Sequence, residues 1–272
     1  MNVAEQSGAQ NMQADLPPNR PWLRVGWMSD VGLARELNED ALVALTLDYE
    51  QGDERQSIGL FAIADGMGGY AHGEHASEGA IRCIAQALLR QLIAPAIGGS
   101  AGSDSLNDVM RNAVVSAHEQ VLHEYPGAGT TLTIALVFGS SLAIAHVGDS
   151  RAYLCRNGDL QQLTRDHSLV ARLVELGQQS AEEAEFDPRR NMLYRALGQG
   201  DTLEVDFQFQ EFNAGDRLLL CSDGLWGQLD KHELARVLCE RADPFAGCAE
   251  LVELANEAGG PDNISAIIVM RQ

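Results

Sequence analysis

Polar and apolar residues alternate along the chain in two patterns, one typical of strands and one typical of helices. Apolar runs bounded by turn residues predict three early strands, at residues 22–30, 41–47 and 57–65. A helical pattern follows over residues 74–92, because Ile81, Ile84 and Leu88 recur at the i, i+3 and i+7 spacing of one helix face. Strands therefore precede the first helix.

A second helix follows a stretch rich in glycine and serine, residues 94–105, which we expect to form a flexible loop. Met110, Ala113, Ala117 and Val121 line one face of this helix. Strand patterns then return, at residues 130–138, 141–150, 151–164, 203–212 and 216–224.

Tight turns and a short interruption divide these later strands. Glycine and serine residues at 139–141 predict one hairpin, and Asn157-Gly158 predicts another. Residues 167–200 interrupt the series of predicted strands with a short helix at 169–176 and a polar stretch. Two helical patterns and one final strand complete the chain, at residues 231–241, 244–258 and 264–270.

Paired helices separated by runs of strands indicate the fold class. Strands that alternated one for one with helices would favour a doubly wound parallel sheet, and this chain lacks that order. We expect an α+β fold, a four-layer αββα sandwich in which two antiparallel sheets pack together and helix pairs cover them. No internal repeat is present.

The N-terminal residues differ from the rest in composition. Residues 1–20 are polar and end near Pro17 and Pro18, which predicts a disordered leader before one domain at 21–272. They lack the basic and apolar regions of a signal peptide, and no apolar run reaches the length of a membrane span. We therefore expect a cytoplasmic protein.

The net charge narrows the classes of partner. Lys and Arg number 19 and Asp and Glu number 39, which gives a net charge of −20. Such a surface repels phosphate backbones and anionic lipid, so we expect neither nucleic acid nor membrane as a partner. The five cysteines are odd in number and contain no CxxC pair, so we expect free thiols in a reducing compartment.

Four aspartates lie beside glycines at the ends of predicted strands. Asp65, Asp149 and Asp223 close apolar runs, and Asp262 precedes the last strand. Any one of them is more often a turn residue than a ligand, but four in this setting are hard to explain as turns. Clustered carboxylates repel one another, and a hard divalent cation such as Mg²⁺ or Mn²⁺ relieves that repulsion. The backbone carbonyl of Gly66 would offer a further oxygen ligand.

Residues 32–40, GLARELNED, add further candidates. Arg35 near a metal-binding edge would clamp a phosphate in a bidentate manner, although alone it is more often a surface ion pair. His72 and His75 lie three residues apart, but no third ligand stands at suitable spacing, so two exposed imidazoles at a helix start are favoured over a zinc site.

The chain resembles the protein phosphatase 2C family, the metal-dependent protein serine/threonine phosphatases, and its DGMGG motif resembles the bacterial branch. The resemblance covers roughly residues 22–272 in eight ordered motifs: SDVGLARELNED, FAIADGMGG, GTTLTIALV, HVGDSRAYL, LTRDHSLV, RNMLYRALG, LLLCSDGLW and GGPDNISAIIV.

The resemblance implies the same sandwich, with residues of about 168–200 as a flap over the site. It implies two bound metals and a third, weaker site. Asp65 would bridge the two metals, and the Gly66 carbonyl would bind one of them. Asp223 and Asp262 would complete a shell, and Asp149 would join Asp223 at the third site. The remaining positions are Glu39 and Asp40, which would hold metals or their waters, and Arg35, which would bind phosphate.

The implied activity is hydrolysis of phosphoserine and phosphothreonine in proteins by a metal-activated water, in a monomer that reverses a bacterial Ser/Thr kinase. Met67 stands where eukaryotic members carry a histidine proposed as general acid, so a metal-bound water would protonate the leaving group. Tyr70 and Asp187 also depart from common family residues and affect substrate choice. A phosphopeptide-binding pseudophosphatase, a regulator acting through a partner and a hydrolase of small phosphoesters remain alternatives.

Overall fold

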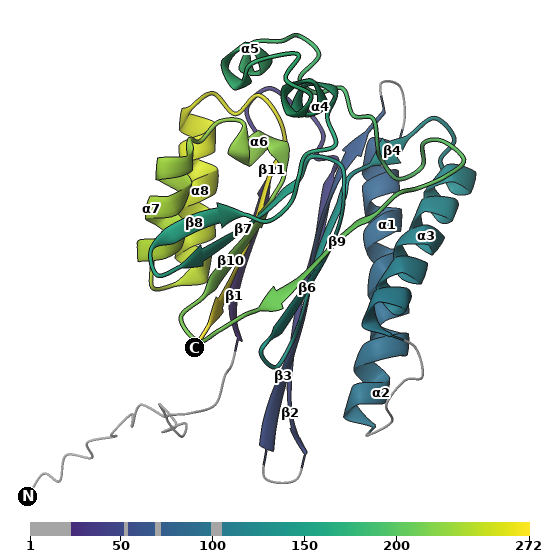
Figure 1. Cartoon of the computed structure of the whole chain (residues 1–272), viewed down its shortest axis with the longest axis vertical. Coiled ribbons are helices and arrows are strands. Elements are labelled where there is room, and N and C mark those ends of the chain that lie inside the picture. The colour runs from purple at the N-terminus through teal and green to yellow at the C-terminus, as the bar shows by residue number, and fades with distance from the viewer. Residues whose placement is uncertain (1–22, 52–53, 69–71, 99–104) are drawn as a thin grey trace, which may run out of the picture.

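The computed structural model describes residues 23–51, 54–68, 72–98 and 105–272 of the chain. The predicted leader, Gly69 and Tyr70 lie outside these residues. Two antiparallel sheets stack face to face, and helices cover their outer faces (Figure 1). The α+β sandwich expected from the sequence is therefore confirmed.

One sheet has the strand order β1-β11-β10-β7-β8. Its strands are β1 (Leu23–Asp30), β7 (Arg151–Arg156), β8 (Asp159–Gln162), β10 (Arg217–Cys221) and β11 (Ile264–Arg271). The inner strand β11 is buried along its whole length, as expected for a strand covered on both faces. The β7–β8 hairpin turns at Asn157 and Gly158, whose φ angles of 54° and 83° match the predicted turn.

The other sheet has the order β2-β3-β5-β6-β9, with β4 paired to β3. Its strands are β2 (Asp40–Gln51), β3 (Glu54–Met67), β4 (Gly129–Thr130), β5 (Leu132–Phe138), β6 (Ser141–Val147) and β9 (Asp206–Glu211). Strand β3 continues past the predicted end at Asp65, because Gly66 and Met67 pair with β4.

Helices α1 (Gly73–Leu88) and α3 (Leu106–Glu124) cover the sheet containing β3, and α7 (Lys231–Glu240) and α8 (Pro244–Glu257) cover the sheet containing β11 (Figure 1). Three apolar cores result. One lies between the two sheets, around Phe61 and Ile267, and one lies under each helix pair. The short helix α6 (Asp223–Trp226) follows β10.

The first helix extends further than the sequence predicted. It passes through a π-helical turn, η1 (Leu89–Ile93), into α2 (Ala94–Ile97), so the expected loop is helical at its beginning. Pro95 is tolerated there because it stands in the first turn of α2. The rest of that loop, residues 99–104, lies outside the described residues.

This continuous helix also changes the assessment of membrane spans. By length and composition alone, the stretch Gly73–Ile97 could cross a bilayer, contrary to the expectation that no segment could. One such helix is weak evidence, since core helices pass the same test. Here Ala76, Ala80, Ile84 and Leu88 pack into the core beneath α1 and α3.

The expectation of five free thiols is wrong for two cysteines. Cys155 of β7 and Cys239 of α7 form a disulfide across a sequence separation of 84 residues, with their Cα atoms 6.0 Å apart. The spacing gave no sign of this bond because it depends on how α7 packs on the sheet. Cys83, Cys221 and Cys248 are free.

Candidate functional site

Five aspartates from both sheets converge at one end of the sandwich. Asp40 begins β2 and is the register partner of Asp65 on β3. Asp149 lies in the turn after β6, Asp223 begins α6, and Asp262 lies just before β11. The strand ends of two stacked sheets therefore place side chains that are distant in sequence at a common edge.

Buried carboxylates perturb one another strongly in this cluster. Burial, reinforced by the charges of the other four aspartates, raises the pKa of Asp65 well above its ordinary value. Burial raises the pKa of Asp40 to about 7 and that of Asp223 to about 6, and it also raises the pKa of Asp149. Asp65 is the aspartate on which the charges of the other four all act, which suits the bridging role predicted for it.

The donor set fits a hard divalent cation. Oδ1 of Asp40 is buried and has no hydrogen-bond partner among the described residues. A buried carboxylate oxygen left without a partner is costly, and a cation or its water would satisfy it. Every side-chain ligand candidate is a carboxylate, which Mg²⁺ and Mn²⁺ prefer over softer ligands.

Arg35 lies at the edge of this cluster. Its Nη2 donates a hydrogen bond of 2.8 Å to Oδ2 of Asp262, and the side chain lines the neighbouring cleft. One of five N–H donors is thus committed, and the others can contact an incoming phosphoryl group. Glu39 lies close enough for its charge to act on Arg35, and burial raises the pKa of Glu39.

Gly66, directly after Asp65, allows the start of α1 to pack closely against the site. A Cβ at Gly66 would lie 2.1 Å from the carbonyl oxygen of Gly73, and one at Gly73 would lie 2.3 Å from Oε1 of Glu39. The start of α1 therefore presses directly against the site. The missing side chain at Gly66 does not open space for substrate, because the backbone of α1 fills that place.

Hydroxyl and amide side chains hold the acids in place. Ser222 donates to Oδ2 of Asp40 at 2.7 Å and accepts the Ser265 amide at 2.9 Å. Thr131 Oγ1 accepts the amide of Asp65 at 2.9 Å. These residues lie inside recognisable motifs, but the sequence analysis assigned them no role. Their signal was a small polar residue within an otherwise apolar strand end.

Asn263 fixes the segment that carries Arg35. Its Oδ1 accepts the amide of Glu39 at 2.8 Å, and its Nδ2 donates to the carbonyls of Val31 and Leu37, each at 2.9 Å. The side chain is buried, so all three bonds are protected from water. Asn263 thereby sets the position of Arg35 relative to Asp262.

A cleft of about 730 Å³ opens beside the aspartates, with the flap as its other wall. In the flap, α4 (Leu169–Glu175) agrees with the predicted short helix, and α5 (Ala181–Glu185) was not predicted. Both helices lie above the sheet edge where the acids meet (Figure 1). Asp187 belongs to the structure of the flap, because it accepts hydrogen bonds from Arg189 and Gln179.

Two histidines and a tryptophan support the site from behind. His146 contacts Thr133 and the Arg165 carbonyl, and His167 accepts the Gly148 amide, so both histidines make structural hydrogen bonds. Trp226 packs partly against the core under α7 and α8 and also supports the site. Its Nε1 donates to the Asp149 carbonyl at 3.0 Å, and the Arg151 guanidinium lies 3.4 Å from its ring centroid.

Comparison with known proteins agrees with this geometry. The serine/threonine protein phosphatase PstP of Mycobacterium tuberculosis is 36% identical over 254 residues, which is 90% of this chain and 44% of that protein. This chain therefore spans less than half the length of PstP. The serine/threonine phosphatase stp of Listeria innocua is 37% identical over 251 residues, covering 89% of this chain and 94% of its own.

The solved structures include a PstP catalytic domain in complex with two manganese ions. It superposes with a TM-score of 0.74 at 34% identity, covering 92% of this chain and 99% of that one. The family model described as protein phosphatase 2C matches residues 34–256. These residues include Arg35 and four of the five aspartates, so the chain belongs to the protein phosphatase 2C family.

Proposed function

We propose that this chain hydrolyses phosphoserine and phosphothreonine in proteins, using a water activated by two Mn²⁺ or Mg²⁺ ions. The observation that carries the proposal is the convergence of five mutually repelling aspartates beside a cleft that Arg35, Asp223 and Asp262 line. The names of the relatives support it, since they are serine/threonine phosphatases and one holds two manganese ions.

The residues divide into those that hold cations and one that binds phosphate. Asp65, between the other acids, would hold both ions, and Asp223 and Asp262 would complete one shell. Asp149, whose strongest charged neighbour is Asp223, would join it at a third, weaker site. When bound, the cations acidify a water and neutralise charge on the phosphoryl oxygens.

The protein's own contribution is to position the phosphate. Asn263 fixes the segment that carries Arg35, and the guanidinium can hold two equatorial oxygens at once. Trp226 anchors the turn that carries Asp149. The flap and the start of α6 enclose the cleft, where a peptide on either side of the phosphorylated residue would lie.

Hydrolysis of a phosphothreonine peptide tests the proposal. We expect turnover with Mn²⁺ or Mg²⁺, none with chelator, and loss of turnover in Asp65→Ala. Arg35→Lys should lower kcat/KM while retaining metal binding, because lysine cannot form the bidentate contact. Asp159→Asn, an exposed acid of β8, is the matched control and should keep full activity.

Two outcomes would redirect the assignment. A folded protein that binds the peptide but turns it over with neither metal would be a phosphopeptide-binding module. Turnover of p-nitrophenyl phosphate without turnover of the peptide would indicate a hydrolase of small phosphoesters.

The proposal extends to partners and setting. We propose substrates that a Ser/Thr kinase has phosphorylated, a monomeric enzyme and a cytoplasmic location. The net charge of −20 supports the exclusion of nucleic acid and anionic membranes as partners. Light scattering of the purified chain would test the monomer directly.

A further inference from the structure

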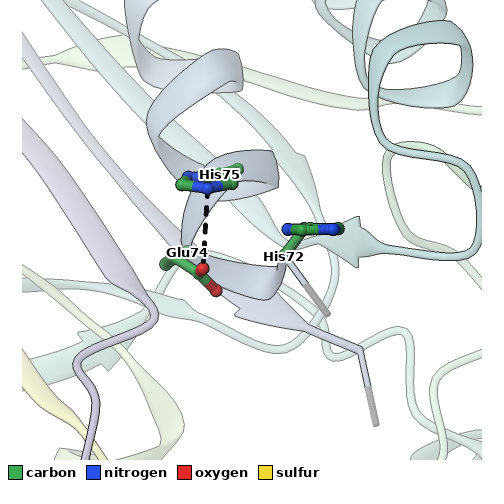
Figure 2. Close-up of side chains that lie close together, drawn as sticks. All are labelled: His72, Glu74 and His75. Atoms are coloured by element: carbon green, nitrogen blue, oxygen red, sulfur yellow. Dashed lines mark ion pairs between the residues drawn. The ribbon is translucent and has the colours of Figure 1, made fainter. Parts of the chain in front are cut away.

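A second group of metal-ligating side chains lies at the start of α1. Figure 2 shows His72, from the turn before the helix, together with Glu74 and His75 from its first turn. Their ligand atoms all lie within 4.8 Å of one another, and Nε2 of His75 is 3.7 Å from Oε1 of Glu74. The spacing of the two histidines in the sequence indicated no third ligand, and the structure supplies Glu74.

The backbone at His72 is strained in a way that forms this group. His72 has a φ of 85°, in the left-handed region that side chains other than glycine seldom adopt. Among the described residues, the only other non-glycine with positive φ is Asn157, in a hairpin turn that requires it. His72 caps the helix without a side-chain cap hydrogen bond, so helix capping does not account for the strain.

The two imidazoles are held beside each other. Their ring centroids lie 5.3 Å apart with planes inclined by 12°. The tilted ring of Tyr125, the residue directly after α3, has its centroid 6.1 Å from that of His75. Gly79 makes room for that tyrosine, because a Cβ there would lie 2.9 Å from its ring. This packing limits how far His75 can turn away from His72.

The ligand chemistry differs from that of the aspartate centre. Two neutral imidazoles and one carboxylate, with a water in the fourth position, suit Zn²⁺ and similar transition metals rather than Mg²⁺. Zinc ligands in a tetrahedron lie about 3.4 Å apart for bonds of about 2.1 Å. The exposed side chains of His72 and His75 can close the remaining distance by rotation.

We propose that His72, Glu74 and His75 form a binding site for a single Zn²⁺-type ion, separate from the aspartate centre. Gly73 lies between His72 and Glu74 in the chain. Its backbone packs against Gly66, and its Cα lies next to the Glu39 carboxylate. An ion here fixes the left-handed turn onto α1 and so fixes the wall of the aspartate centre. This inference does not depend on the proposed phosphatase activity.

Zinc titration of the full chain in excess Mg²⁺ tests the site, because Mg²⁺ fills carboxylate sites and competes poorly for imidazole. Calorimetry would count the ions, and NMR of the imidazole nitrogens would locate them. We expect one equivalent of Zn²⁺ to shift the resonances of two histidines. His72→Gly, which tolerates the left-handed backbone, and His75→Ala should each weaken binding by at least tenfold.

The controls separate this site from other places where zinc could bind. His232→Ala removes an exposed histidine of α7 and should leave binding unchanged. Asp65→Asn disturbs the aspartate centre and should also leave the imidazole shifts intact. The proposal is overturned if Zn²⁺ shifts no histidine resonance, or if the double variant His72→Gly/His75→Ala, folded by circular dichroism, binds as many equivalents as the unaltered chain.

Discussion

Small polar residues inside apolar strand ends decide how the acids are arranged. Ser222 is the clearest case, since one buried hydroxyl joins the Asp40 carboxylate to the Ser265 amide and so links a strand of each sheet. The hydroxyl favours the charged form of Asp40, while burial opposes it. Residues outside the carboxylate cluster thus influence the charge state of those proposed to hold the cations.

Replacing Ser222 by alanine should weaken both fold and metal binding. The change leaves the buried Ser265 amide without its partner, at a cost of about 1–3 kcal/mol in the free energy of unfolding. It also releases Asp40, which should lower metal affinity by about 10–100-fold. Urea unfolding in chelator would measure the first effect and Mn²⁺ titration the second. Ser141→Ala, at an exposed site on β6, should change neither.

His146 should make stability depend on pH. Burial, helped by neighbouring His167, lowers its pKa to about 3, so the folded protein keeps it neutral while the unfolded chain protonates near pH 6.5. The unfolded state therefore binds the extra proton, and the free energy of unfolding falls as the pH drops from about 6.5 towards 3, by up to about 1.4 kcal/mol per pH unit.

Denaturant unfolding between pH 7 and 4.5 would measure this slope. His146→Gln should reduce the slope of the free energy of unfolding against pH, because the unfolded variant no longer takes up a proton at this position. This holds even if the variant's overall stability changes. A variant with an unchanged slope would show that His146 is already protonated in the folded state.

At the level of elements, the periodicity of the sequence predicted which helices and strands form, but it did not predict all of their ends. The paired helices were predictable because each buries one face, and strand β9 was predictable from its alternation, although Phe209 on it is exposed. The end of α1 was not, since a π-helical turn carries the chain into Pro95 where the composition indicated a loop. Four of the five aspartates were identifiable as strand-end acids, and Asp40 was expected only from the family resemblance. Ser222 and Asn263 act only through contacts across the fold.

The Cys155–Cys239 disulfide joins α7 to strand β7 of the sheet beneath it and should stabilise the packing of the two elements. A covalent link over 84 residues restricts the unfolded chain, which is worth about 2–4 kcal/mol. Cys239→Ser should lower the free energy of unfolding by that amount under oxidising conditions and change it little in reductant. Cys83→Ser, at a free cysteine, is the control. Identical stability of the unaltered chain with and without reductant would contradict the prediction.

At the scale of the whole molecule, the site exists only where the edges of two sheets meet. Asp40 and Asp65 come from one sheet, and Asp223 and Asp262 adjoin strands of the other. Packing of the core between the sheets brings their charges together, so folding without cations works against electrostatic repulsion. Cation binding should therefore stabilise the native state as a whole.

The variant Asp65→Asn should have opposite effects on the stability of the cation-free protein and on its activity. Removing the charge on which the other four act should raise the melting temperature of the chelated protein. The same change should abolish the rise that Mn²⁺ produces in the unaltered chain and eliminate phosphatase turnover. Thermal unfolding with chelator and with Mn²⁺ would show both effects, and a variant less stable than the unaltered chain in chelator would refute the repulsion argument.

The pairing of the first described strand with the last has a consequence for synthesis on the ribosome. Strands β2, β3, β5 and β6 are nearly consecutive in the chain, so most of one sheet can assemble early as the polypeptide emerges. The other sheet cannot, because β11 lies between β1 and β10 and is synthesised after every other described strand. Until those residues emerge, Asp262 is missing and β1 has no partner. The nascent domain is therefore expected to lack a complete site, and to stay open to chaperones, until β11 has left the ribosome.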